Sequence, residues 1–260
     1  WAALAELIRR DSPDSIVHCA AIVGVPASVL SPHRTFDVNV GGSLTLFEAA
    51  RLFGVRRIVH ISSEETYGAF QADCIDESHP QNPVLAYGIS KLAVEHLGRT
   101  FATLYGLEVI HLRTCWVYGP GLPRPRVPKT FVDAAVAGRP FHLPWGAAMK
   151  VDHTYIDDLV AGVLGALDCA KHPYDAYNLG SGRAPTLAKI VEIIRELVPG
   201  ADISAGEGEF EHSLPGASVP AVRKGALNVE RAHAAFGYTP RFDIRSGLAA
   251  YIEAVRAGNV

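Results

Sequence analysis

Short apolar runs and longer stretches with helical spacing alternate along the chain. Continuous apolar runs are typical of buried strands, and apolar residues at every third or fourth position are typical of helices. The helical spacing is clearest at 36–53 and at 85–105. Four strands of one sheet are predicted at 15–19, 57–61, 108–113 and 174–179. Since helices separate these strands, the pattern predicts an α/β protein with a parallel sheet.

Weaker signals predict the remaining elements. Residues 22–35 are rich in Pro and Ser and are expected to form a loop. Asp157 and Asp158 are expected to cap a helix at about 158–170, and Thr186 one at about 187–198. The other predicted elements are a helix ending near residue 10, helices at about 129–138, 228–237 and 245–257, and a strand at 150–156.

Composition narrows the class of protein. The chain has 260 residues, of which 48% are hydrophobic and 20% charged, as in ordinary globular proteins. Its net charge of -3 gives no basic field for nucleic acid or an anionic membrane. No apolar run approaches the roughly 20 residues of a membrane span. The four cysteines lack the spacing of a metal site, so we expect reduced thiols, no metal and a cytoplasmic protein.

Tyr87-Gly88-Ile89-Ser90-Lys91 is the stretch with the most informative chemistry. It opens the predicted helix 85–105, which places Tyr87 and Lys91 on one face, four residues apart. An ammonium beside a phenol favours the phenolate, so we expect Lys91 to lower the pKa of Tyr87. Such a tyrosine can exchange a proton with a substrate hydroxyl. The alternative is a solvated helix pair, since this spacing arises by chance in roughly one such chain in five.

Polar residues follow the predicted strand 57–61 directly. They are Ser62, Ser63, Glu64 and Glu65, and open α/β sheets place their sites at such strand ends. Two adjacent carboxylates near a ketone can act as a general acid and a general base. The alternative is that these glutamates are solvated loop residues.

The first strand ends in a different set of residues. Ala20 and Ala21 permit a cofactor to approach closely, although tight packing explains small residues equally well. His18 in the same stretch is expected to be a core histidine rather than a catalyst.

Taken together, the motifs resemble a known family. Five occur in family order: Val17-His18 with Ala20-Ala21, Asn39-Val40-x-Gly42-Ser43, Ser62-Ser63-x-x-x-Tyr67-Gly68, Tyr87-x-x-x-Lys91 and Val117-Tyr118-Gly119-Pro120. The chain therefore resembles the extended short-chain dehydrogenases/reductases, the NAD(P)-dependent epimerase/dehydratases that act mostly on nucleotide sugars. The resemblance covers nearly the whole chain.

The resemblance implies a Rossmann-like doubly wound parallel sheet with a smaller C-terminal substrate lobe. Residues 1–121 and 156–180 would form the dinucleotide-binding domain, and 122–155 and 181–260 the substrate lobe. The family's glycine-rich turn, which cradles the cofactor pyrophosphate, does not occur in these 260 residues. We therefore expect a further segment of roughly 50–60 residues, two βα units, to precede them. Two long helices, 36–53 and 85–105, would pair across a homodimer axis.

The resemblance also implies roles for individual residues. Catalytic roles fall on Ser63, Tyr87, Lys91 and Glu65. NAD, or alternatively NADP, would be bound by Ala20, Ala21, Asn39, Ser62, Tyr87, Lys91, Thr114 and Val117. The sugar would contact Ser63, Glu64, Glu65 and Trp116.

Two positions depart from the family pattern. Trp116 stands where the family has an Asn that contacts the sugar diphosphate, and Val151 stands where it has a phosphate-binding Arg. The absence of these two phosphate contacts indicates either that other residues bind the phosphates or that the substrate is smaller, such as a sugar acid or a sugar lactone. The leading function is a sugar epimerase or dehydratase similar to UDP-glucose 4-epimerase. The alternatives are a dehydrogenase of a small hydroxylated substrate and a non-catalytic binding protein.

Overall fold

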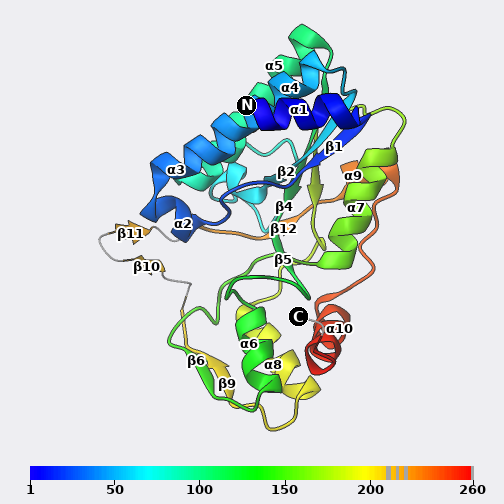
Figure 1. The fold of residues 1–260 in the computed structure, drawn as a ribbon. Coiled ribbons are helices and arrows are strands. Elements are labelled where there is room, and N and C mark those ends of the chain that lie inside the picture. The colour runs from blue at the N-terminus through cyan, green and yellow to red at the C-terminus, as the bar shows by residue number, and fades with distance from the viewer. Residues whose placement is uncertain (209–211, 215–216, 220–221, 259–260) are drawn as a thin grey trace.

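A four-stranded parallel sheet forms the centre of the molecule (Figure 1). The computed structural model describes residues 1–208, 212–214, 217–219 and 222–258. In the sheet the strands follow the order β1-β2-β4-β8, and neighbours are parallel. Their bounds are Ser15–His18, Arg57–Ser63, Glu108–Thr114 and Ala176–Leu179. The predicted α/β fold with a parallel sheet is confirmed, and each strand lies within about two residues of its predicted position.

Helices cover both faces of the sheet (Figure 1). One face carries α1, α4 and α5, and side chains such as Phe47 and Phe101 pack there against Ile58 and Val109. The other face carries α7 and α9, where Val59 and other residues of the sheet are buried. The bounds of these helices are Ala2–Asp11, Gly42–Leu52, Ala86–Tyr105, Ile156–Asp168 and Glu230–Phe236.

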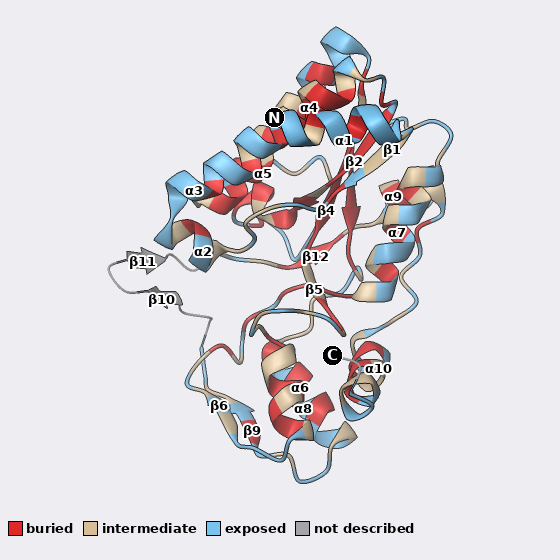
Figure 2. Ribbon diagram, in the orientation of Figure 1, coloured by how far each residue is buried: buried red, intermediate tan, exposed pale blue. Residues whose placement is uncertain are grey.

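A second hydrophobic core lies beyond the carboxyl ends of the strands. Phe131, Leu187 and Leu248 are all fully buried in it. Figure 2 shows buried residues gathered in the strands of the sheet and on parts of α6 and α8. The elements around this second core are β5 (Trp116–Tyr118), α6 (Lys129–Val136), β6 (Phe141–Leu143), β7 (His153–Tyr155), α8 (Leu187–Leu197), β9 (Ile203–Ala205) and α10 (Ile244–Arg256). The division into two domains stays a prediction, and α9, assigned above to the substrate lobe, packs against β8 of the sheet.

Several short elements complete the chain. The segment predicted as a loop at 22–35 contains two short helices, each with a proline in its first turn, where the missing N–H is tolerated. They are α2 (Val25–Leu30) and α3 (Pro32–Phe36), and a π turn (Asp37–Gly41) joins α3 to α4. A 3-10 turn (Glu64–Tyr67) follows β2. Two further pairs of short strands are β3 (Cys74–Ile75) with β12 (Ala226–Leu227), and β10 (His212–Leu214) with β11 (Ala217–Val219).

The predicted caps have different outcomes. Thr186 caps α8, its hydroxyl accepting the Lys189 N–H at 3.2 Å. Asp157 and Asp158 do not cap α7, because they lie inside its first turn. Asp158 instead accepts the backbone N–H groups of Arg241 and Phe242, so it fixes the segment before α10.

A row of three histidines crosses the sheet. The strand register places His18, His60 and His111 side by side, and His60 Nδ1 lies 3.0 Å from His111 Nδ1. Burial lowers the pKa of His18 and of His111 to about 4, and that of His60 well below its usual value. His18 hydrogen-bonds Ser43 at 2.8 Å. The row is therefore neutral, and the prediction that His18 is a core histidine is confirmed.

Candidate active site

A pocket of about 450 Å³ opens at the carboxyl ends of β1, β2 and β4. Its lining comes from residues at the ends of these strands, from the first turns of α5 and from the segment 122–127. Among the residues predicted for the site, those that line it are Ser62, Ser63, Glu64, Glu65, Tyr87, Lys91, Thr114, Trp116 and Val117. The structure thus brings together side chains from three separate parts of the chain.

Three predicted cofactor residues lie outside this lining. Ala20 and Ala21 follow β1, and it is the neighbouring Cys19 that lines the pocket. Asn39 is buried behind the pocket, where its amide donates to the Ile22 carbonyl at 3.0 Å and its oxygen accepts the Ile22 N–H at 2.7 Å. Asn39 also donates to the Ser90 hydroxyl at 3.0 Å, so it ties the segment after β1 to α5.

Tyr87 and Ser63 form the pair at the centre of the pocket. Gly88 allows α5 to approach the turn after β2, because a Cβ there would lie 2.5 Å from the Glu65 carbonyl oxygen. Both side chains line the pocket, and Ser63 acts to lower the pKa of the Tyr87 phenol. Burial nevertheless raises the pKa of Tyr87 to about 12, and Ser63 offsets only part of that effect. The expectation of a lowered tyrosine pKa is therefore wrong for this structure.

Lys91 lies one helical turn further along α5. Its ammonium donates to the Ile61 carbonyl at 2.7 Å, and its side chain lines the same pocket. Burial lowers the pKa of Lys91 to about 8, because the charged form loses hydration. Tyr87 is 6% exposed and Lys91 4% exposed, so the alternative of a solvated helix pair is wrong.

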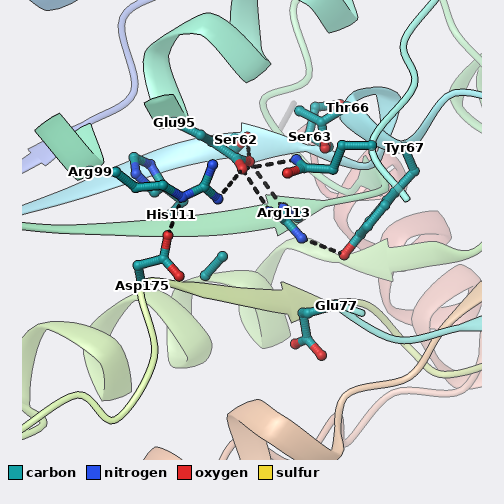
Figure 3. Close-up of polar contacts among 12 residues, drawn as sticks. Ser62, Ser63, Thr66, Tyr67, Glu77, Glu95, Arg99, His111, Arg113 and Asp175 are labelled. Atoms are coloured by element: carbon teal, nitrogen blue, oxygen red, sulfur yellow. Dashed lines mark hydrogen bonds and ion pairs between the residues drawn. The ribbon is translucent and has the colours of Figure 1, made fainter. Parts of the chain in front are cut away.

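A buried polar network supports the strand ends (Figure 3). The Ser62 hydroxyl, assigned above to the cofactor, donates to Glu95 at 2.7 Å. Glu95 forms two bonds with Arg113, of 3.0 and 2.7 Å, and Arg113 donates to the Tyr67 hydroxyl at 2.9 Å. Arg113 holds the pKa of Glu95 at about 2, although burial opposes this. Side chains of α5, β2 and β4 are therefore locked together directly beneath the site.

Lys224 contacts two carboxylates of the pocket lining, and the sequence did not indicate it. It belongs to the segment before β12, yet its ammonium donates to Glu64 at 2.5 Å and to Glu65 at 3.0 Å. The side chain of Glu64 is 4% exposed and that of Glu65 17%, so neither is a solvated loop residue. No local motif marks Lys224, because its partners lie about 160 residues earlier in the chain.

Arginines of the segment 122–127 provide a second concentration of charge. The Arg126 guanidinium carbon lies 4.0 Å from the centroid of the Trp116 ring, at a distance typical of a cation–π contact. Burial and the charge of Arg124 lower the pKa of Arg126. Arg126 forms no ion pair with any residue in the described ranges, and its side chain lines the pocket. Arg124 donates to the Val23 carbonyl and ties this segment to the one after β1.

Metal sites and membrane-spanning helices are two further features that bear on the function of the protein. Within the described ranges, no group of three or more His, Cys, Asp or Glu side chains could hold a metal ion. None of the helices that the structure describes combines the length and apolar character needed to cross a membrane.

The parallel sheet, with Ser63, Tyr87 and Lys91 in a pocket at its strand ends, defines the class of protein: a Rossmann-like α/β fold with its pocket at the carboxyl edge of the sheet. Residues 1–180 match the family model of the NAD dependent epimerase/dehydratase family. The chain belongs to this family, and the resemblance inferred from the motifs is confirmed.

Individual relatives give the same result. The chain is 31% identical to the UDP-glucose 4-epimerase of Mycolicibacterium smegmatis, over 97% of this chain and 79% of the relative. It is 30% identical to the UDP-glucuronate 4-epimerase of Thermodesulfobacterium geofontis, over 75% of this chain and 60% of the relative. The crystal structure of the UDP-glucose 4-epimerase of Thermotoga maritima with UDP-glucose superposes with a TM-score of 0.89 at 26% identity, covering 99% and 82% of the two chains.

Proposed function

We propose that the protein is an NAD-dependent epimerase that acts on a nucleotide sugar. The observation that carries the proposal is the burial of Ser63, Tyr87 and Lys91 in the lining of one pocket at the strand ends. The relatives described above support a UDP-sugar of the glucose or glucuronate type as substrate. A non-catalytic binding protein would have no need of a buried phenol, hydroxyl and ammonium in one pocket.

The residues of the pocket fit the reactive end of the cofactor named in the family description. Cys19, Ile61 and Thr114 line it at three strand ends, and the Lys91 ammonium is buried between them, available to hydroxyl groups of a ribose. NAD, when bound, would accept a hydride from the sugar carbon and return it. We assign Lys91, Thr114 and Val117 to this contact. Ala20 and Ala21 act through packing, and Asn39 and Ser62 through side-chain hydrogen bonds that hold the neighbouring segments in place.

The protein's own residues then manage the substrate proton. Ser63 would hold the substrate hydroxyl, and Tyr87 would take its proton and later return it. Because the pKa of Tyr87 is about 12 in this structure, the proton must leave while a positive charge is near the phenol. Lys91 is the nearest such group along α5.

Dehydration is the second candidate reaction, and the carboxylate pair favours it. Burial, followed by the charge of Glu65, raises the pKa of Glu64 to about 7, so Glu64 can carry a proton at neutral pH. Next to a sugar ketone, Glu65 would accept a C–H proton while Glu64 protonates the departing hydroxyl. A C–O bond breaks, a C=C bond forms and water leaves.

Three broader assignments complete the proposal. We place the protein in the cytoplasm, an assignment supported by four unpaired cysteine thiols. We propose a homodimer through α4 and α5, supported by apolar side chains on their outer faces, including Leu44 and Leu104. We retain the division into a dinucleotide-binding domain and a substrate lobe, which is supported by the separate hydrophobic core around α6 and α8.

The test is turnover of UDP-glucose and UDP-glucuronate with NAD, followed by proton NMR of the sugar. We expect the wild-type protein to form the 4-epimer, and Tyr87→Phe to turn over at least about 100-fold more slowly, since it lacks the acid–base group. Tyr105→Phe, at the exposed end of the same helix, is the matched control and should behave as wild type.

The products also separate the alternatives. Loss of water from the sugar would select dehydration, and net reduction of NAD would select a simple dehydrogenase. Turnover by Tyr87→Phe equal to that of wild type would rule out the assigned role of Tyr87.

A further inference from the structure

Lys224 joins the segment before β12 to two carboxylates of the pocket lining, Glu64 and Glu65. Its ammonium donates to Glu64, to Glu65 and, at 3.4 Å, to the Gly68 carbonyl. Its side chain is 9% exposed, and the two carboxylates it contacts line the substrate pocket beside Ser63 and Tyr87. A lysine buried among functional carboxylates is costly to place, so its position calls for a specific explanation.

The backbone around Lys224 is fixed independently of its side chain. Ala226 donates to the Asp73 carbonyl at 2.8 Å, and Leu227 donates to the buried Asp152 carboxylate at 3.1 Å. Gly225 passes so close to Asp73 that a Cβ would lie 2.3 Å from its carbonyl oxygen. The chain therefore aims Lys224 at the carboxylates from a rigid support, and the contact is not a chance meeting of flexible side chains.

The contact has an electrostatic consequence. Two neighbouring carboxylates in a buried place repel each other, so one of them tends to hold a proton. For Glu64, burial and Glu65 raise the pKa, whereas Lys224 and Arg126 lower it, and the balance lies at about 7. Without Lys224, only Arg126 would oppose the effect of burial and of Glu65 on the pKa of Glu64. Glu64 would then stay protonated well above neutral pH.

We propose that Lys224 is a positioning residue of the active site, which holds Glu64 and Glu65 side by side against the sugar as a pair that carries one exchangeable proton. The inference rests on the proposed function for its meaning, since the pair would serve proton transfer to and from the sugar. A pair with one proton can donate from one carboxyl group and accept at the other. Lys224 thereby couples the C-terminal part of the chain to the chemistry at the end of β2.

The first experiment measures the proton directly, on protein without substrate or cofactor. Glutamate side-chain carboxyl groups are labelled with carbon-13 and titrated by NMR from pH 5 to 10. We expect one resonance of the wild-type protein to titrate near pH 7 and to be missing from Glu64→Gln, which assigns it. A wild-type protein with no glutamate titrating near neutral pH would overturn the proposal, whatever the Lys224 variants do.

The variants then test the part played by Lys224. In Lys224→Met and in Lys224→Gln the midpoint should move up by about one pH unit or more, because a neighbouring positive charge is lost. Lys224→Arg, which keeps the charge, should stay close to wild type. Arg223→Met is the matched control: this neighbour is exposed and pairs with Asp73 at 2.6 Å, away from the pocket, so the midpoint should not move. If the titration midpoint is unchanged in folded Lys224→Met or Lys224→Gln, Lys224 only stabilises the fold and does not set the protonation of the pair.

The pH dependence of enzyme activity is a second, independent test of the role of Lys224. If the protein turns over a nucleotide sugar, the limb of its kcat/KM profile near pH 7 should move upward in Lys224→Met and stay in place in Arg223→Met. Tyr87→Phe should lose turnover but keep the carboxyl titration, because a neutral phenol and a phenyl ring carry the same charge at pH 7. Failure of the proposed function and failure of the Lys224 proposal therefore give different results.

Discussion

At the scale of single residues, burial and neighbouring charges have opposite effects on the pKa values of side chains in the pocket. Tyr87 is neutral in this structure because the cost of burying a phenolate exceeds the help from Ser63 and from the positive charge of Arg126. Lys91 is directed to the Ile61 carbonyl rather than to the phenol, so the spacing of four residues alone does not produce an activated tyrosine. Activation has to accompany a ligand that changes the charge or hydrogen bonding around the pair.

Arg126 is the residue for which we predict an effect on substrate binding. The family resemblance implies phosphate contacts at the positions of Trp116 and Val151, where neither side chain carries a positive charge. Arg126 supplies a cation in the pocket lining beside Trp116. Hydrogen bonds to charged groups contribute about 1.5–3 kcal/mol, so we expect Arg126→Gln to weaken binding of a UDP-sugar by roughly 10- to 100-fold. Isothermal titration with UDP-glucose in the presence of NAD measures this loss.

The comparison variant is Arg139→Gln, an exposed arginine after α6. It should bind as wild type does. If Arg126→Gln binds the UDP-sugar as tightly as Arg139→Gln, the phosphates are held elsewhere and Arg126 only packs against Trp116.

At the scale of elements, the contact between Glu95 and Arg113 joins α5 to β4. Both side chains are buried, and the pair also receives the Ser62 hydroxyl at the end of β2. Removing one partner of a buried ion pair leaves an uncompensated charge and costs about 3–5 kcal/mol. We therefore expect Glu95→Gln to lower the free energy of unfolding by that amount at pH 7, measured by urea denaturation.

The same pair predicts how this loss depends on pH. The pKa of Glu95 is about 2 in the folded protein and about 4.3 in an unfolded chain, so its stabilising effect is complete above about pH 4.3. It is lost as the pH falls from there through about 2. The difference between wild type and Glu95→Gln should therefore shrink over this range. A variant of the solvent-screened pair on α4, Glu48→Gln, should leave stability close to that of wild type at every pH.

Local patterns and long-range contacts differ in how far the sequence predicts them. The strands and the helix carrying Tyr87 follow from periodicity, because each is a continuous run of residues with one kind of neighbour. The helices α2 and α3 were missed because Pro and Ser, read as loop residues, here occupy helix starts. Lys224 and Arg126 were missed because their roles arise from segments far apart in the chain, and neither stands in a motif.

At the scale of the whole molecule, the pocket lies between two hydrophobic cores. Ser63 comes from the end of β2 and Lys91 from α5, whereas Arg126, Trp145 and other lining residues belong to segments around the second core. A ligand in the pocket would contact both parts. Lys224 and Asp152 already link them in this structure, so we expect the two parts to unfold together rather than separately.

The outer faces of α4 and α5 lead to the last prediction, a homodimer. Leu44 and Leu52 on α4, and Ile89 and Leu104 on α5, are between 40% and 64% exposed. A Cβ added to Gly41 or Gly42 would meet nothing within 4 Å, so a second helix could approach closely there. Fully burying such apolar side chains contributes about 1.5–3 kcal/mol each, enough for several to hold a dimer together.

We expect light scattering at micromolar concentration to give twice the monomer mass for wild type and the monomer mass for the double variant Leu44→Lys/Leu104→Lys. Charges at these positions would be buried without partners in the dimer, at a cost that exceeds the gain from the remaining contacts. Leu164→Lys, at a 52% exposed leucine on α7 over the opposite face of the sheet, is the matched control and should remain dimeric. A wild-type protein of monomer mass would contradict the homodimer, and dissociation by Leu164→Lys alone would place the interface on α7 instead.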